Sequence, residues 1–245
     1  MSLLPLDRSR LRLLAVAAAA FLAGCGGSEV IVEATFPRPL VEQLPVSMGV
    51  VIPDELYNFI YTEDIPDQSL WTIALGDANV AMLEPLFEGM FRQTKDIDSL
   101  ALAAADTTLD GVIEPKLEKF EFDVPQGERD KFVEVWLQYQ ITVYEPSGAT
   151  VIEWPVSGYG KSELLRDPED AVQRAAVVAM REAGATIATK FSEQPQIKEW
   201  LGGIGNAAPI TGPQAAVDGN ATGSDRLPWN GGFGRQQRSG PDLDR

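Results

Sequence analysis

The only cysteine of this 245-residue chain, Cys25, is the residue best placed to undergo chemistry. It directly follows Leu22, Ala23 and Gly24, at the end of an apolar run of about ten residues that begins at Leu13. Three arginines precede the run, so residues 1–24 have the three regions of a secretory signal sequence. The run is shorter than the roughly 20 residues that a membrane-spanning helix needs. Ala23 and Gly24 are small enough for signal peptidase, which places the thiol beside a cleavage site.

The sequence Leu22-Ala23-Gly24-Cys25 resembles the lipobox of bacterial lipoprotein precursors. The resemblance implies cleavage before Cys25, a thioether-linked diacylglycerol on its sulfur and acylation of the new amino terminus. Such acyl chains attach a protein stably, since each buried CH₂ contributes about 0.8 kcal/mol. No aspartate follows Cys25, which implies the inner leaflet of the outer membrane, facing the periplasm. The alternatives are an ordinary secretory signal or an uncleaved N-terminal anchor.

The distribution of charge limits the partners of the chain. Its formal net charge is −16, and removing residues 1–24, which carry a net +2, leaves −18. Residues 202–245 contain four aspartates and four arginines, so the excess acid lies between Cys25 and Leu201. Because nucleic acids and anionic lipids are bound through Lys and Arg, neither is an expected partner. A basic protein surface or divalent cations would suit this charge better.

The residue inventory also restricts catalysis. The chain contains no histidine, and acylation would remove its only thiol, so we expect no Ser-His-Asp triad, no Cys nucleophile, no zinc site and no cofactor. The sequence therefore favours a protein that is not an enzyme. Paired carboxylates, as in glycoside hydrolases, remain an open alternative, although solvated surface charge is the preferred interpretation of these pairs. The pairs are Asp64 with Asp67, Asp96 with Asp98, and Glu84 with Glu88.

One short motif suggests phosphate binding. Residues Gly158-Tyr159-Gly160-Lys161-Ser162 match the end of the GxxxxGK[ST] loop, but Pro155 stands where its first glycine should be. The next predicted helix begins only near Asp167, so the amide groups of a helix N-terminus would not reach the phosphate. We therefore expect no nucleotide, and a strand-ending loop in which the glycines permit turning.

Composition divides the chain into four parts. Residues 1–24 are the signal peptide, and residues 25–45, with three prolines, form a lipidated tether. Residues 46–201 are long enough for one domain. Residues 202–245 contain ten of the 22 glycines and are expected to be disordered. Within this tail, Leu227-Pro228-Trp229 and Phe233 are either a docking motif or, as preferred, isolated aromatic residues.

Alternating apolar and polar residues predict the strands. Residues 132–144 alternate strictly and lead through a Pro-Ser-Gly turn into residues 151–159, which predicts an antiparallel hairpin. Residues 112–122 supply another strand, whose beginning Pro115 confines to an edge or an irregularity. Residues 46–52 are apolar enough for a buried strand, and residues 57–61 for a short extended segment.

Two helices are expected. The first has Asp77 as its N-cap and contains Pro85, which would either kink it or move its start to Glu84. The second has Asp167 as N-cap and Pro168 at its first position, with apolar residues recurring every three or four positions as far as Phe191. The predicted fold is an α+β two-layer sandwich: a mainly antiparallel sheet of about four strands with both helices packed on one face.

Three aromatic residues of the predicted hairpin are the candidate ligand or partner surface. Trp136, Tyr144 and Trp154 would line a groove for a lipid or a peptide, or would pack beneath a helix. Packing beneath a helix is the preferred interpretation, because aromatic residues more often occupy such positions than line a groove.

The lipobox and the order of elements together resemble small periplasm-facing envelope lipoproteins. These include the lipopolysaccharide-assembly lipoprotein group and the auxiliary lipoproteins of ABC-type transport systems. The resemblance implies a non-enzymatic docking or auxiliary factor in envelope assembly or transport, with an envelope protein as partner. The alternatives are a lipid- or glycan-binding module and a carboxylate-dependent envelope hydrolase. The residues that carry the resemblance are Leu22–Cys25, 113–122, the hairpin, 170–191 and Trp200-Leu201.

Overall fold

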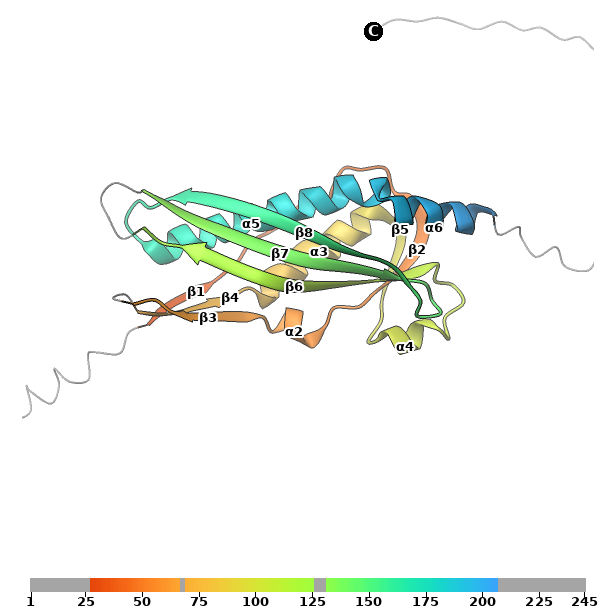
Figure 1. The fold of residues 1–245 in the computed structure, drawn as a ribbon, viewed down its shortest axis with the longest axis horizontal. Coiled ribbons are helices and arrows are strands. Elements are labelled where there is room, and N and C mark those ends of the chain that lie inside the picture. Colours follow the sequence, from red (N-terminus) through yellow and green to blue (C-terminus); the bar gives the residue numbers. More distant parts are fainter. Residues whose placement is uncertain (1–26, 67–68, 126–130, 207–245) are drawn as a thin grey trace, which may run out of the picture. The chain divides into compact units, whose positions relative to one another are not determined.

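The computed structural model describes residues 27–66, 69–125 and 131–206. These residues form five α-helices, one 3₁₀ turn and two separate β-sheets (Figure 1). The α+β class predicted from the sequence is confirmed. The signal sequence, Cys25 and most of the expected C-terminal tail lie outside the described residues.

The larger sheet differs from the expected one. It has five strands in the order β5-β2-β6-β7-β8, and β2 pairs in parallel with both β5 and β6. The prediction of a four-stranded, mainly antiparallel sheet is therefore wrong in strand number and in these two pairings. The parallel pairing of β2 with β5 requires a long crossover, which contains α3. The strands are β2 Leu44–Val50, β5 Phe91–Asp96, β6 Gly111–Asp123, β7 Phe132–Tyr144 and β8 Thr150–Glu163.

The predicted hairpin is confirmed as β7 and β8, which pair in antiparallel orientation. The amide of Gly148 donates to the carbonyl of Glu145 at 2.9 Å, and Gly148 has a φ of 90°, a conformation that glycine adopts without strain. Pro115 of β6 lies just beyond Ile113, the last β6 residue paired with β2, so its missing amide faces an open edge as expected.

A second sheet, absent from the prediction, has the order β1-β4-β3. Its strands are β1 Ser28–Ile31, β4 Leu70–Ala74 and β3 Ile60–Asp64, with β1 parallel to β4. The expected tether at residues 25–45 therefore contains a strand, and Val30, Val32 and Phe36 are buried. The expected extended segment at 57–61 is instead the end of helix α2, Asp54–Tyr57, and the beginning of β3.

Helices α3, Gly76–Met90, and α5, Pro168–Lys190, lie on the same face of the five-stranded sheet (Figure 1). Pro85 lies inside α3, so a helix start near Glu84 is wrong, and the N-cap is Leu75 rather than Asp77. Asp167 caps α5 as predicted, because its Oδ1 accepts from the amide of Glu169 at 3.1 Å. The remaining elements are α4 Leu100–Ala103, the turn η1 Phe191–Glu193 and α6 Pro195–Asn206, which continues past the expected domain end at Leu201.

The glycines of the rejected phosphate motif serve packing between α5 and β8. Gly158 and Gly160 lie within β8, not in a loop, which corrects the expected turn. A Cβ atom on Gly160 would come within 1.8 Å of the Ala175 carbonyl oxygen, and one on Gly158 within 2.1 Å of that of Ala179. Only glycine lets the two backbones approach this closely.

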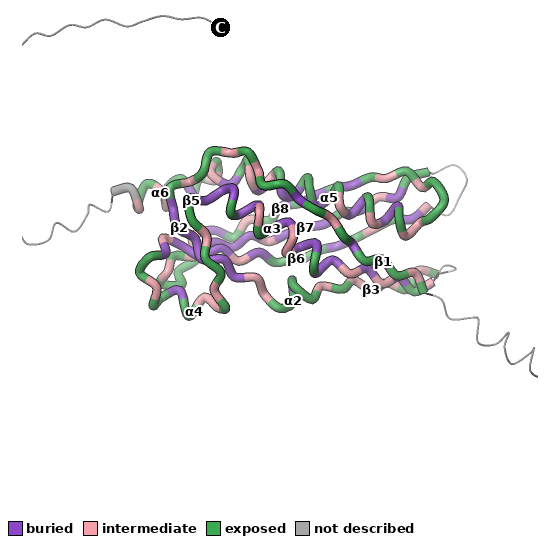
Figure 2. Tube along the Cα trace, turned by 180° about the vertical axis from the view of Figure 1, so that it is seen from behind, coloured by how far each residue is buried: buried purple, intermediate pink, exposed green. Residues whose placement is uncertain are grey.

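The main core lies between the helices and the inner face of the five-stranded sheet. Tyr139, Phe87, Phe91 and Phe191 are among its largest fully buried side chains. Figure 2 shows the helix side, where the segment after β1 crosses over the helices. On this path the carbonyl of Glu33 accepts from Gln173 at 3.2 Å. Among the described helices, none combines the length and apolar character that crossing a bilayer requires.

Candidate functional site

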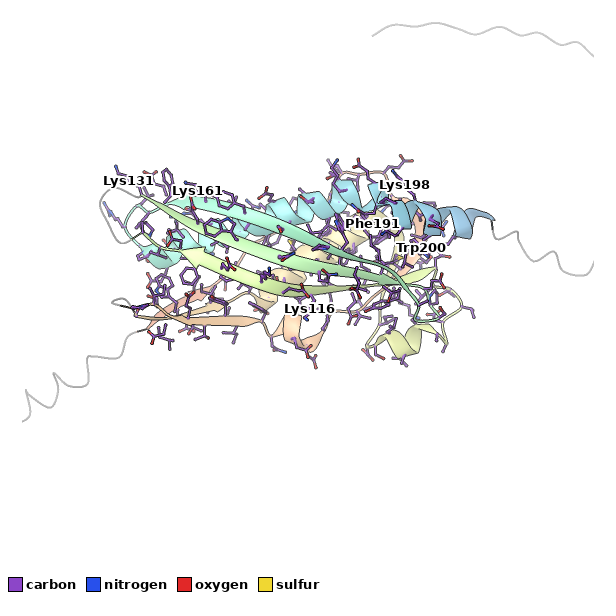
Figure 3. All side chains as sticks on the ribbon, viewed as in Figure 1. Lys116, Lys131, Lys161, Phe191, Lys198 and Trp200 are labelled. Atoms are coloured by element: carbon purple, nitrogen blue, oxygen red, sulfur yellow. The ribbon has the colours of Figure 1, made fainter. Side chains whose placement is uncertain are left out.

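The outer face of strands β6, β7 and β8 carries the candidate site. We call this surface, turned away from α3 and α5, the open face. Strand alternation places mostly polar side chains there, and Figure 3 labels two of them, Lys116 on β6 and Lys161 on β8. By strand register and alternation its members include Glu114, Lys116, Glu121, Glu134, Trp136, Gln138, Gln140, Glu153, Tyr159 and Lys161.

Two aromatic residues interrupt this polar face. Trp136 of β7 and Tyr159 of β8 are register partners, with ring centroids 5.4 Å apart and ring planes at 41°. Trp136 is 39% exposed and Tyr159 36% exposed. Phe132, at the start of β7, is also exposed, and the Lys161 ammonium lies 4.6 Å from its ring centroid. Three rings are thus accessible at one end of the hairpin.

A hollow of about 460 Å³ adjoins the aromatic pair. Its polar rim includes Lys119, Glu121, Gln138 and Glu182. Glu182 belongs to α5, and its Oε2 accepts from the Tyr159 amide at 2.6 Å. Because β8 is an edge strand, its outward amides could pair with another strand, and the Glu182 carboxylate accepts from one of these amides instead. The hollow therefore presents ring surface and polar groups to a ligand, without an open strand edge at Tyr159.

An ion pair lies beside the rings. The Lys161 ammonium is 2.7 Å from Oε1 of Glu134, and Figure 3 labels this lysine near Lys131 at the same end of the hairpin. The bond from Lys161, with one from the Tyr159 hydroxyl, keeps the pKa of the Glu134 carboxyl below its ordinary value. Glu134 is therefore ionised at neutral pH, which makes it an acceptor for a partner's donors.

The other two predicted aromatic residues lie elsewhere. Tyr144 is at the far end of β7, where its hydroxyl donates to Oε2 of Glu114 at 2.9 Å and its ring packs on a small second core around Val112. Trp154 points to the inner face of β8 and packs partly buried on the main core. The three residues therefore do not line one groove. Trp154 lies on the inner, helix-covered side of the sheet, as the preferred interpretation expects, and Tyr144 lies on the open face but at its other end, eight residues from Trp136 along β7.

Tyr159 is the site residue that sequence reasoning missed. The sequence places Ile152, Trp154 and Val156 on one face of the second hairpin strand, so alternation alone puts Tyr159 on the opposite face. Register then decides which β7 residue it meets, and register depends on the turn. Counting outward from the Glu145–Gly148 turn would have paired Tyr159 with Trp136 only if the register shift between Val143 and Tyr144 were known.

The carboxylate pairs form no metal cluster. Within residues 27–66, 69–125 and 131–206, no group of three or more Asp, Glu, His or Cys side chains could hold a metal ion. Asp96 and Asp98 line a separate hollow of about 430 Å³ with Lys95 and Asp106. The bond from Lys95 holds the pKa of Asp106 well below its usual range. Glu88 pairs with Arg38.

Some predicted residues cannot be placed. Leu22, Ala23, Gly24 and Cys25 lie outside the described residues, as does Asp67 of the pair with Asp64.

No family model matches the chain, and no curated protein matches its sequence. Among solved structures, a Xanthomonas campestris protein described by the DUF330 family model is 11% identical, with a TM-score of 0.41, covering 69% of this chain and 99% of that one. A minor lipoprotein from Acinetobacter baumannii is 7% identical, with a TM-score of 0.37, covering 60% and 92%. Lipoprotein GNA1162 from Neisseria meningitidis is 9% identical, with a TM-score of 0.32, covering 61% and 100%. Likeness this distant does not assign the chain to a family.

Proposed function

We propose that this protein is a lipid-anchored, non-enzymatic component of the bacterial envelope that docks on a partner protein through the open face. The anchor is the diacylglycerol on Cys25, and the location is the periplasm-facing leaflet of the outer membrane. The partner belongs to envelope assembly or transport. The observation that carries the docking function is the exposed pair of Trp136 and Tyr159 on an otherwise polar sheet face.

The pair has the properties of an interface centre. Aromatic residues are enriched where binding energy concentrates, and a surrounding polar rim excludes water from such a centre. Here Phe132 extends the ring surface, and Glu134 with Lys161 supplies charged groups at its border. Rigid strands hold both rings, so binding requires little ordering of the protein.

The charge of the domain indicates the partner's chemistry. The mature chain carries a net −18, with Glu121, Glu134 and Glu182 close to the rings. Complementary potentials steer association and select partners. The partner surface is therefore basic, with an apolar or aromatic centre that covers Trp136.

The test uses the lipidated full chain in its native envelope. A photo-reactive residue at position 136 is expected to crosslink to one envelope protein, which is then purified and titrated against the chain. Truncating a central aromatic side chain costs about 2 kcal/mol, so Trp136→Ala should raise Kd roughly 30-fold. Leu40→Ala, which removes an exposed apolar side chain beside Pro39 on the α3 side of the fold, should leave Kd unchanged.

Two results would contradict the proposal. Crosslinks from position 136 spread over many unrelated proteins would indicate no specific partner. Equal Kd values for Trp136→Ala, Leu40→Ala and the unchanged chain would show that the interface does not lie on the open face.

A glycan is the second candidate ligand, favoured by the hollow beside Trp136. Gln138, Glu121 and Lys119 surround the ring with donors and acceptors, and sites with few well-placed polar groups beside aromatic surface suit small ligands. Titration with soluble envelope saccharides would change Trp fluorescence in the unchanged chain and not in Trp136→Ala. Competition between the saccharide and the crosslinked protein would assign both ligands to the same surface.

A further inference from the structure

The three-stranded sheet exposes apolar side chains on its outer face. Ile31 of β1, Ala74 of β4 and Ile60 of β3 are register partners, so they form one row across the sheet. Ile31 is 56% exposed and Ile60 61% exposed. Neighbouring strands lie about 4.8 Å apart, so the row is continuous.

Two further exposed apolar residues lie on this side of the fold, with Thr72 of β4 standing between Ala74 and Leu70. Leu70 lies on the same face of β4 and is 49% exposed, and Tyr57 is 52% exposed at the end of α2. The main chain of Tyr57 contacts Gly76, just beyond the end of β4. We call Ile31, Tyr57, Ile60, Leu70 and Ala74 the outer patch.

The outer patch lies close to the expected lipid anchor. Strand β1 begins at Ser28, three residues after Cys25. Gly27 already lies against β4, since a Cβ atom there would come within 2.8 Å of the Leu70 carbonyl oxygen. A fully extended chain spans at most about 3.6 Å per residue, so two residues reach about 7 Å. An acylated Cys25 would therefore keep Leu70 and β1 next to the membrane interface.

The small sheet is joined firmly to the rest of the fold. Its inner face packs on β6, where the ring centroids of Trp71 and Phe122 are 5.3 Å apart and those of Tyr61 and Phe120 are 5.1 Å apart. The amide of Val32, just after β1, donates to the carbonyl of Ala74 at 2.9 Å. Any surface that holds the small sheet therefore also orients the five-stranded sheet.

We propose that the outer patch rests on the lipid bilayer, so that anchor and patch together set the orientation of the protein on the membrane. This inference rests on the acylation of Cys25 in the proposed function. The patch alone is small, but an anchor six residues before Ile31 gives it a high effective concentration at the interface, so a weak contact suffices. The same small area is far below what a stable dimer buries.

The charges on this face specify the lipid. Glu29 and Asp64 lie on the same side of the sheet as Ile31 and Leu70. Anionic headgroups repel carboxylates, so the outer patch suits zwitterionic phospholipids. Raising the fraction of anionic lipid should weaken the contact.

The experiment places an environment-sensitive fluorophore on the lipidated full chain. Cys25 is the only natural cysteine and its sulfur is acylated, so Ile60→Cys gives a single labelling position. Val178→Cys, 43% exposed on α5, is the matched control. In vesicles of phosphatidylethanolamine and phosphatidylcholine, the label at position 60 should emit at shorter wavelength and resist a water-soluble quencher. The label at position 178 should do neither.

Each other outcome overturns the inference in a distinguishable way. If the chain binds vesicles but its label at position 60 is quenched as readily as the label at 178, the outer patch does not contact the bilayer, and the anchor remains supported. A chain that carries no acyl group and does not bind vesicles would contradict both the lipid anchor and the contact of the outer patch with the bilayer. A blue shift at 60 without vesicles that grows with protein concentration would assign the outer patch to a second copy of the chain.

A variant separates the patch from the anchor. Ile31→Glu places a carboxylate at the β1 end of the row without disturbing the core, because Ile31 is exposed. With the label at position 60, Ile31→Glu should lose the blue shift while the chain stays on vesicles. The corresponding change on α5, Val178→Glu, should keep it.

Discussion

The hydroxyl of Tyr139 donates a 2.6 Å hydrogen bond to Oδ1 of Asn79, and both side chains are fully buried. Asn79 belongs to α3 and Tyr139 to β7, so this bond joins the helix layer to the sheet. The side-chain Nδ2 of Asn79 in turn donates to the carbonyl of Leu56 in α2 at 3.3 Å. These two hydrogen bonds thus connect β7, α3 and α2 inside an apolar core.

Tyr139→Phe should therefore destabilise the protein by about 1–3 kcal/mol, because it leaves the Oδ1 of Asn79 buried without a donor. Chemical denaturation measures the loss. Tyr57→Phe removes an exposed hydroxyl and should change stability by less than about 0.5 kcal/mol. Equal effects of the two changes would contradict the importance of the buried bond.

The same tyrosine predicts a loss of stability in alkali. Burial raises the pKa of Tyr139 well above the value of about 10 expected in the unfolded chain. Above pH 10 the unfolded state therefore loses a proton that the folded state keeps, and stability falls by up to about 1.4 kcal/mol per pH unit for this group. Tyr139→Phe should show a shallower fall over the same range. Parallel curves for the two proteins would contradict the prediction.

Gly160→Ala should prevent α5 from packing on β8. The added Cβ would meet the backbone oxygen of Ala175, which cannot move without shifting the helix. We expect a loss above about 4 kcal/mol, or no folded protein. Gly203→Ala in α6 is the control, because nothing lies within 4 Å of its Cβ and alanine favours a helix by about 1 kcal/mol. Circular dichroism with thermal melting compares the two.

Asp167→Ala should lower the melting temperature by a few degrees, because it removes the acceptor for the Glu169 amide at the start of α5. A side-chain hydrogen bond with Glu169, together with hydrogen bonds from the backbone amides of Asp170 and Glu169, lowers the pKa of Asp167. The contribution of the ionised carboxylate is therefore present above the unfolded value of about 4 and disappears as the pH falls through the folded value. The melting temperatures of the two proteins should converge in acid. Ser99→Ala, at the start of α4 where no side chain caps the helix, should have no such effect.

Local patterns explain what the sequence predicted well. The β7–β8 hairpin and α5 each depend on neighbours within the same stretch of chain: strict alternation, a Pro-Ser-Gly turn, and Asp167-Pro168 before an apolar repeat. Strand β1 is only four residues long, and its partner β4 lies about 40 residues further on. Residues 28–31 alone contain no signal for that pairing, so the local sequence predicts part of a tether there.

Of the two aromatic residues of the candidate site, the sequence predicted one, because the position of the other depends on pairing between strands. The sequence named Trp136 as a candidate ligand or partner residue, whereas the position of Tyr159 beside it depends on the register of the whole hairpin. Trp154 and Tyr144 were grouped with Trp136 by residue type. The structure separates them, because Trp154 lies on the inner face of β8 and Tyr144 lies eight residues from Trp136 along β7.

The bond between Gln173 and the Glu33 carbonyl joins residues 140 positions apart. Segments held by partners so distant in sequence acquire their structure late, because loop closure must precede the contact. Residues 28–36 are synthesised early, yet α5, which covers them, is synthesised much later. This part of the fold therefore becomes protected only after α5 has been made, and until then it stays open to proteases and chaperones.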